Sequence, residues 1–179
     1  EDRMRSLAAD FSVEDPLVLQ LGGSDPATMS KAVKVAADFG YKDVNINVGC
    51  PSDKVSGAGA FGAVLMRSPQ LVCDLARAAG DALGTAPTVK CRIGVDELDS
   101  YEHLCEFIQI VSSTGGVTHF IIHARKAILG GKFSPKQNRT VPPLKYDYVH
   151  HLVRDFPHLS FSLNGGVLTV HAAKELLAV

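Results

Sequence analysis

Five short apolar runs alternate with segments that carry helix signals, and this alternation restricts the fold of the 179-residue chain more than any other feature. The runs are rich in β-branched and aromatic residues, as strands are, and each is too short to be a helix. They cover residues 17–21, 44–48, 88–93, 119–123 and 160–163. Strands that alternate with helices form a parallel sheet covered by helices. The sequence therefore predicts an α/β fold.

The helix signals between these runs are capping side chains, prolines and glycines. Asp25-Pro26 and Ser68-Pro69 each combine a cap with a proline in the first turn, and Ser100 and Thr169 are further caps. Glycines after the expected last turns act as stop signals. We expect helices over residues 26–39, from 69, from 100 to 114, over 146–156 and from 169.

Polar side chains recur at the carboxyl ends of all five strands, and they decide between two parallel-sheet architectures. They are Gln20, Asn45, Asn47, Lys90, Arg92, His123, Arg125 and Asn164. An open sheet concentrates its site at one switch point, whereas a barrel collects site residues from several successive strands. A (β/α)8 barrel usually takes about 250 residues. We therefore expect residues 1–179 to form one incomplete (β/α)8 TIM-barrel domain, with five units and without the first and last strands.

Composition and cysteine spacing exclude several classes of protein. With 46% hydrophobic residues, 21% charged residues and a net charge of -1, the chain suits a globular domain rather than a disordered one. No apolar run approaches the roughly 20 residues that span a bilayer, and the charged first residues lead us to expect no signal peptide. The four cysteines form no C-x-x-C pair, and the histidines show no metal spacing. We expect a protein of the cytoplasm or an organelle, with no membrane partner and no metal.

The segment from Asn45 to Pro51 places two amides on one face of a strand and then a thiol, Cys50, on the following turn. Pro51 favours an extended backbone at Cys50, which would hold the thiol at a defined angle. A cysteine with an ordinary pKa of about 8.5 is mostly protonated at neutral pH and can donate a proton. A small buried cysteine at a strand end is an equally good interpretation.

Further candidates follow the later strands. Lys90 and Arg92 could bind an anion or stabilise negative charge, and a buried lysine can also form a Schiff base; for Arg92 an ion pair is the alternative. His123 is either a residue of the barrel mouth or a hydrogen-bonded core histidine. The backbone of Asn164-Gly165-Gly166 could bind a phosphate before a helix, although a plain tight turn fits as well.

Two loops carry composition signals. Residues 57–62 match G-x-G-x-x-G but do not directly follow a strand, so we interpret them as a glycine-rich active-site loop. The segment 124–146 contains six cations and no acidic residue. These cations could bind nucleic-acid phosphates. A solvated loop balanced by the acidic stretch 96–106 is the alternative. The cations are Arg125, Lys126, Lys132, Lys136, Arg139 and Lys145.

Taken together, these motifs resemble the tRNA-dihydrouridine synthases, a family of flavin enzymes with a TIM barrel and a smaller helical domain. The matching segments follow the family's order and are residues 18–21, 45–51, 89–94, 122–125 and 164–166. Other segments are similar to the A-type subfamily, which acts on uridines of the tRNA D-loop. They are residues 50–55, 61–63, 134–136, 138–139 and 142–144.

The resemblance implies that FMN passes a hydride to C6 of a flipped-out uracil, that Cys50 protonates C5, and that NADPH reduces the flavin. It also implies a monomer whose helical domain follows residue 179. The residues that would bind FMN are Gln20, Lys90, His123, Asn164, Gly165 and Gly166. Those that would contact the uracil or the tRNA are Asn47, Arg92, Lys136 and Arg139.

Three other functions remain open at this point. A flavin barrel of the dihydroorotate dehydrogenase type would use a similar cysteine as a base, but such a small substrate has no use for the cations of residues 124–146. A non-catalytic RNA-binding fragment would fail to hold flavin. An aldolase that forms a Schiff base through Lys90 would be trapped by borohydride.

Overall fold

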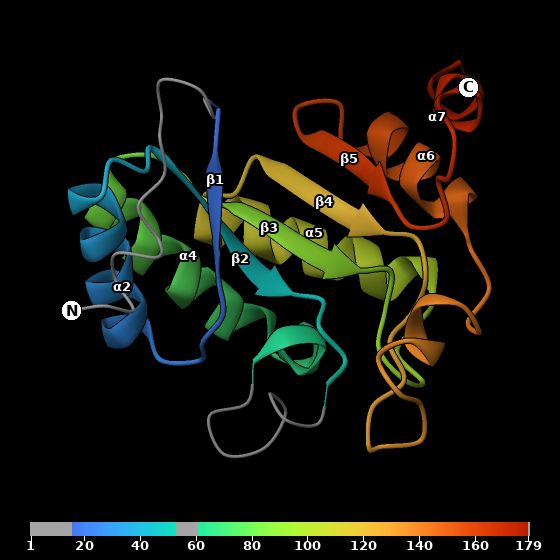
Figure 1. Cartoon of the computed structure of the whole chain (residues 1–179), viewed down its shortest axis with the longest axis horizontal. Helices are drawn as coiled ribbons and strands as arrows, with labels where there is room; N and C mark the ends of the chain where they lie inside the picture. Colours follow the sequence, from blue (N-terminus) through green and yellow to red (C-terminus); the bar gives the residue numbers. More distant parts are fainter. Residues whose placement is uncertain (1–15, 53–60, 179) are drawn as a thin grey trace.

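A computed structural model describes residues 16–52 and 61–178 and shows one parallel sheet of five strands (Figure 1). Neighbours in the sheet are also neighbours in the chain, in the order β1-β2-β3-β4-β5. The predicted strands are confirmed to within one residue at each end. They are β1 (Val18–Leu21), β2 (Asp43–Val48), β3 (Thr88–Arg92), β4 (His119–His123) and β5 (Ser160–Asn164).

The predicted helices are also present, and side-chain caps mark the start of three of them. Ser68, which was also expected to cap a helix, makes no side-chain cap bond. Asp25 accepts a hydrogen bond from the Thr28 backbone N–H at 2.8 Å, and Ser100 and Thr169 cap their helices in the same way. One helix runs a residue further than expected, through Gly115, because Gly116 takes the left-handed stop conformation. The helices are α2 (Pro26–Asp38), α4 (Pro69–Leu83), α5 (Tyr101–Gly115), α6 (Tyr146–Asp155) and α7 (Val170–Leu177).

Two short 3-10 helices were not expected from the sequence. The first, η1 (Gly62–Arg67), follows the segment that begins at Cys50, and the second, η2 (Gln137–Arg139), lies in the long segment between β4 and α6. Such short turns carry no apolar period that a sequence pattern could show. Most of the glycine-rich loop expected over residues 57–62 lies outside the described residues.

The two faces of the sheet differ in chemistry. The face that meets the helices is apolar and buried, and Cys91 lies on it as expected. The other face carries the polar residues of the alternating pattern. The apolar face is lined by Val44, Ile46, Val48, Val89, Cys91, Phe120 and Ile122. None of the described helices is long and apolar enough to cross a membrane.

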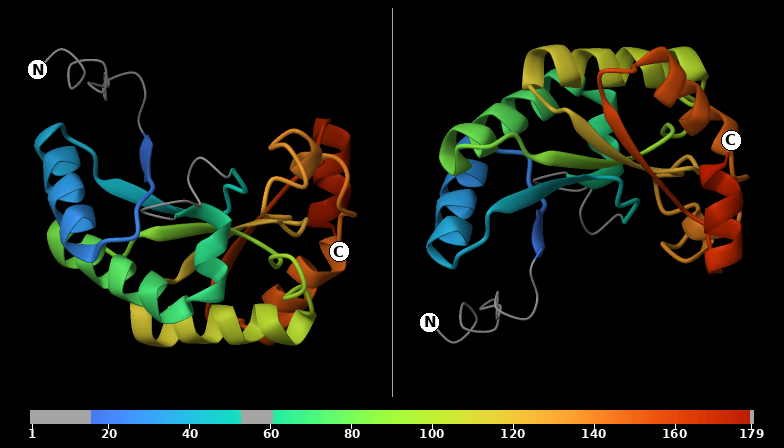
Figure 2. Two further views of the ribbon diagram at one scale, coloured as in Figure 1. Left: turned by 90° about the horizontal axis from the view of Figure 1, so that it is seen from below. Right: turned by 90° about the horizontal axis from the view of Figure 1, so that it is seen from above.

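The strands and helices form an open arc, with the helices on its outer side and the polar face of the sheet on its inner side (Figure 2). Each crossover adds one strand in chain order, as in a barrel, and within the described ranges β1 and β5 each pair with one neighbour. The fold is therefore an incomplete (β/α) barrel whose five strand ends face the same rim.

Candidate functional site

Eight of the predicted site residues line one cleft of about 220 Å³ at the carboxyl ends of the strands. They come from all five βα units, which is possible because parallel strands end at the same rim. Gly165 and Gly166 line a neighbouring pocket of about 600 Å³, and Lys136 lines neither. The residues of the cleft are Gln20, Asn47, Cys50, Lys90, Arg92, His123, Arg139 and Asn164.

A chain of amides holds the turn that carries the thiol. The Oδ1 atom of Asn47 accepts hydrogen bonds from the backbone N–H groups of Gly49 and Cys50, both at 3.0 Å. Its Nδ2 group donates to Gln20 Oε1 at 3.0 Å, and Gln20 donates in turn to Asn45 Oδ1 at 2.7 Å. The half-buried thiol of Cys50 is therefore fixed by side chains from two strands.

Arg92 is 4% exposed, and its guanidinium donates hydrogen bonds to backbone carbonyls; among the described residues it forms no ion pair, which was one alternative. Its Nε donates to Gly49 O at 3.1 Å, and its Nη1 donates to Asn138 O at 2.9 Å and Lys126 O at 3.3 Å. Burial lowers the pKa of Arg92 to about 10, so the group stays charged at neutral pH. Arg92 thus links the Cys50 turn to the segment after β4.

Burial also lowers the pKa of two further groups of the cleft, Lys90 and His123. Burial, followed by the charge of Arg92, lowers the pKa of Lys90, whose Nζ lies 3.4 Å from Asn164 Oδ1. His123 is 7% exposed, and burial together with nearby cations lowers its pKa to about 3. Its Nδ1 atom is buried and has no hydrogen-bond partner among the described residues. A neutral imidazole with an unpaired nitrogen suits a ligand contact.

The turn after β5 requires its glycines. Gly165 and Gly166 have φ angles of +103° and +71°, and Tyr146 Oη donates to Gly165 O at 2.7 Å. A Cβ atom on Gly165 would lie 2.5 Å from the His123 ring, and one on Gly166 would lie 2.9 Å from Tyr146 Oη. The backbone therefore passes the imidazole more closely than any other residue type would allow.

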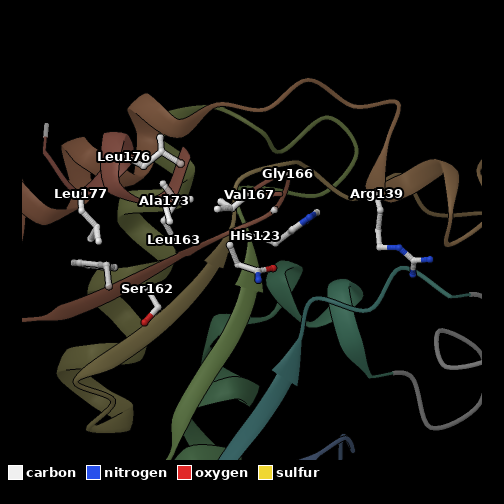
Figure 3. A pocket seen from close by; sticks show the side chains of 12 residues that line it. His123, Arg139, Ser162, Leu163, Gly166, Val167, Ala173, Leu176 and Leu177 are labelled. Atoms are coloured by element: carbon white, nitrogen blue, oxygen red, sulfur yellow. The ribbon is translucent and has the colours of Figure 1, made fainter. Parts of the chain in front are cut away.

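The pocket beside this turn opens between α7 and the cleft. Figure 3 shows His123 between the α7 side chains, including Ala173 and Leu176, on one side and Arg139 on the other. Neither this pocket nor the cleft is lined by an Asp or Glu of the described chain. A phosphate-bearing flavin is the cofactor that the resemblance to tRNA-dihydrouridine synthases implies. It fits a site with cations and no carboxylate, an unpaired imidazole nitrogen and a glycine turn.

The cations of the loop between β4 and α6 fall into two groups. Lys126 pairs with Asp99 at 2.8 Å, Arg125 donates to Pro142 O, and Lys145 lies 4.5 Å from the centre of the Tyr148 ring. These three serve the fold, and for Lys126 the balancing acidic stretch is confirmed. The second group is exposed and forms no ion pair within the described ranges. Its members are Lys132, Lys136 and Arg139.

Three residues near the site were given no role by the sequence. Asn45 continues the amide chain to Thr88 Oγ1 at 2.8 Å, Tyr146 braces the glycine turn, and Asn138 is fully buried beneath the cationic loop. Asn45 carried a signal, since it shares a strand face with Asn47. Asn138 carried only the similarity of residues 138–139 to the A-type subfamily, because nothing in a loop of polar residues indicates that one asparagine is buried. No group of metal-binding side chains gathers anywhere in residues 16–52 and 61–178.

The comparisons with known proteins agree with this geometry. The family model described as dihydrouridine synthase (Dus) matches residues 1–179. The chain belongs to the dihydrouridine synthase family. It is 54% identical over 164 residues to the tRNA-dihydrouridine(20/20a) synthase of Escherichia coli K12, which covers 92% of this chain and 47% of that protein. The corresponding protein of Vibrio vulnificus is 52% identical, with 92% and 50% covered.

This member of the dihydrouridine synthase family thus spans about half the length of the relatives it matches. Among solved structures, the chain is similar to DHDPS from Cyanidioschyzon merolae, with a TM-score of 0.55 at 15% identity. That likeness covers 90% of this chain and 51% of the other, and it concerns the fold alone.

Proposed function

We propose that the protein reduces uridine to 5,6-dihydrouridine in the D-loop of tRNA, with FMN as its cofactor and NADPH as the reductant. One observation carries this proposal: the half-buried thiol of Cys50 shares a cleft with Lys90, His123 and Asn164. A proton donor beside a flavin-type anion site is what the reduction of a pyrimidine double bond needs. The names of the relatives support tRNA as the substrate.

In this reaction the bond between C5 and C6 of the uracil takes up a hydride and a proton. FMN, when bound, supplies the hydride to C6. The thiol of Cys50 donates its proton to C5, and solvent restores that proton after each turnover. Asn47 fixes the thiol turn through two backbone N–H groups, so the donor approaches the base from a constant position.

The remaining residues would bind and orient the cofactor. The ammonium of Lys90 stabilises negative charge that develops nearby, and the neutral His123 offers Nδ1 to a polar group. The Gly165-Gly166 turn would present its backbone to the phosphate. We place FMN against Gln20, Lys90, His123, Asn164, Gly165 and Gly166.

The exposed cations of the loop would bind the tRNA. Lys136 immediately precedes η2, and Arg139 is the last residue of η2 and lines the cleft. Phosphate contacts of this kind position a nucleic acid without reading its sequence. A uridine in a loop is less costly to unstack than one in a helix, which suits chemistry on the base. We propose a monomeric enzyme of the cytoplasm or an organelle.

The test is the oxidation of reduced flavin by tRNA. The flavin-loaded protein is reduced without oxygen and mixed with unmodified tRNA or with orotate, and flavin absorbance is followed. We expect tRNA to reoxidise the flavin and Cys50→Ala to slow this step by about 100-fold or more, the range for a lost general acid. Reoxidation by orotate and not by tRNA would contradict the proposal and favour the dihydroorotate type of enzyme.

A further inference from the structure

Asn138 is 0% exposed, although it lies in a loop whose neighbouring side chains face solvent. Its Oδ1 atom accepts a hydrogen bond from the Ile128 N–H at 2.7 Å. Its Nδ2 group donates to the carbonyls of Ile128, Phe133 and Ser134 at 3.0, 3.2 and 3.4 Å. One buried amide therefore joins both sides of the loop between β4 and α6. The regular secondary structure of this loop is limited to η2.

The backbone carbonyl of the same residue contacts Arg92, which is a residue of the cleft. It accepts the 2.9 Å hydrogen bond from Arg92 Nη1, while Nε of the same guanidinium donates to Gly49 O. Gly49 immediately precedes Cys50. A rigid planar group thus connects the thiol turn to the cationic loop through two hydrogen bonds. We call Arg92 and Asn138 the buried joint.

The joint lies between the residues that would bind tRNA. Lys136 and Arg139 flank Asn138 in the chain, and they are exposed while it is buried, so the loop presents two cations outward and one amide inward. Any shift of Asn138 would move the two cations relative to Cys50. A displacement of about 1 Å at a reacting centre can cost about 100-fold in rate.

We propose that Asn138 is a positioning residue that, through Arg92, sets where tRNA held by Lys136 and Arg139 presents its base to the thiol of Cys50. This inference rests on the function proposed above. Asn138 touches neither cofactor nor base in this account; it fixes the geometry between the surface that binds tRNA and the group that donates the proton.

The experiment measures flavin reoxidation over a range of tRNA concentrations, which separates the limiting rate from the half-saturating concentration. For Asn138→Ala we expect the limiting rate to fall at least tenfold, with a smaller change in half-saturation. Lys136→Ala should show the reverse pattern. Reduction of the flavin by NADPH should stay within about twofold of wild type, because it does not use the joint.

Thr140→Ala is the matched control. Thr140 lies in the same loop and donates only to the carbonyls of Lys136 and Gln137, so its loss leaves the joint intact. We expect wild-type limiting rates for this variant. An Asn138→Ala enzyme that keeps its flavin and matches Thr140→Ala would overturn the inference while leaving the proposed function standing. Wild-type enzyme that tRNA does not reoxidise would overturn both.

A double-mutant cycle tests whether the effect passes through Arg92. Arg92→Lys cannot make the same pair of planar contacts. If Asn138 acts through Arg92, the double variant should be no slower than the slower single variant; effects that multiply would overturn the inference. Where Asn138→Ala does not retain flavin, Asn138→Asp replaces it in all these measurements, since it keeps the acceptor for Ile128 N–H.

Discussion

At the scale of single residues, the site depends on partners that lie far away in the sequence. The spacing of Asn45, Asn47 and Cys50 predicted two amides on one strand face and a thiol after it. It could not predict that Asn47 would accept from the Cys50 N–H, or that Arg92 would donate hydrogen bonds to backbone carbonyls. Side-chain direction follows from strand periodicity, whereas a hydrogen-bond partner depends on which loops meet in space.

His123 gives a pH prediction at this scale. Its pKa in the folded protein is about 3, below its ordinary value of about 6.5, so only the unfolded state takes up its proton between these values. The contribution of His123 to the free energy of unfolding should therefore be complete above pH 6.5. It should fall as the pH drops toward 3, by up to about 1.4 kcal/mol per pH unit. Urea unfolding at pH 7.5 and pH 5 measures it.

The variant His123→Gln isolates this contribution from those of the carboxylates and the other histidines. Between pH 7.5 and pH 5, the free energy of unfolding of this variant should decrease less than that of wild type. His158→Gln, which removes an exposed imidazole, is the matched control. Equal losses for wild type and His123→Gln would show that the imidazole of His123 is protonated in the folded protein at pH 5.

At the scale of elements, strands and helices could be predicted because each carries a local signal. Caps such as Asp25 and Ser100 marked the helix starts, and alternation marked the strand faces. The short 3-10 helices η1 and η2 have no such signal. Their conformation depends on contacts with other segments, for example the hydrogen bond from the Ala63 N–H to Cys50 O at 2.8 Å and the burial of Asn138.

The β5–α7 turn gives a prediction of this kind. Gly165→Ala should lose about 1–3 kcal/mol of unfolding free energy and should reduce flavin content about tenfold, because the new methyl group would displace the His123 ring. Gly116→Ala is the control. Gly116 also has a positive φ, +73°, but a Cβ there meets nothing within 4 Å. Chemical denaturation and the flavin absorbance of the purified variants measure both quantities.

Both variants place an alanine at a positive φ angle, but only Gly165→Ala also places a methyl group against the His123 ring. Gly116→Ala should therefore lose stability by about 1–2 kcal/mol and keep its flavin. A Gly165→Ala protein with full flavin content would contradict the role given to this turn. A Gly116→Ala protein that also loses flavin would show that the loss reflects general destabilisation.

At the scale of the whole molecule, the order of the strands brings polar side chains from all five strands, from Gln20 to Asn164, to one rim. The recurrence of polar side chains after every strand was enough to predict a barrel, and the structure shows the corresponding open arc of five units (Figure 2). The division of the cationic loop could not be predicted. Lys126 turns to Asp99 while Lys136 and Arg139 stay exposed, and only the packed structure separates these two groups.

In the proposed function, the rim reduces uridine in tRNA and Cys50 is the proton donor. The most direct measurement is mass spectrometry of nucleosides from unmodified tRNA after incubation with the flavin-loaded protein and NADPH. We expect a D-loop uridine heavier by two hydrogen atoms with wild type and with Cys105→Ala, which changes a cysteine outside the cleft. Cys50→Ala should form it about 100-fold more slowly or worse. Unchanged uridine with wild type, or equal rates for Cys50→Ala and Cys105→Ala, would contradict the proposed function.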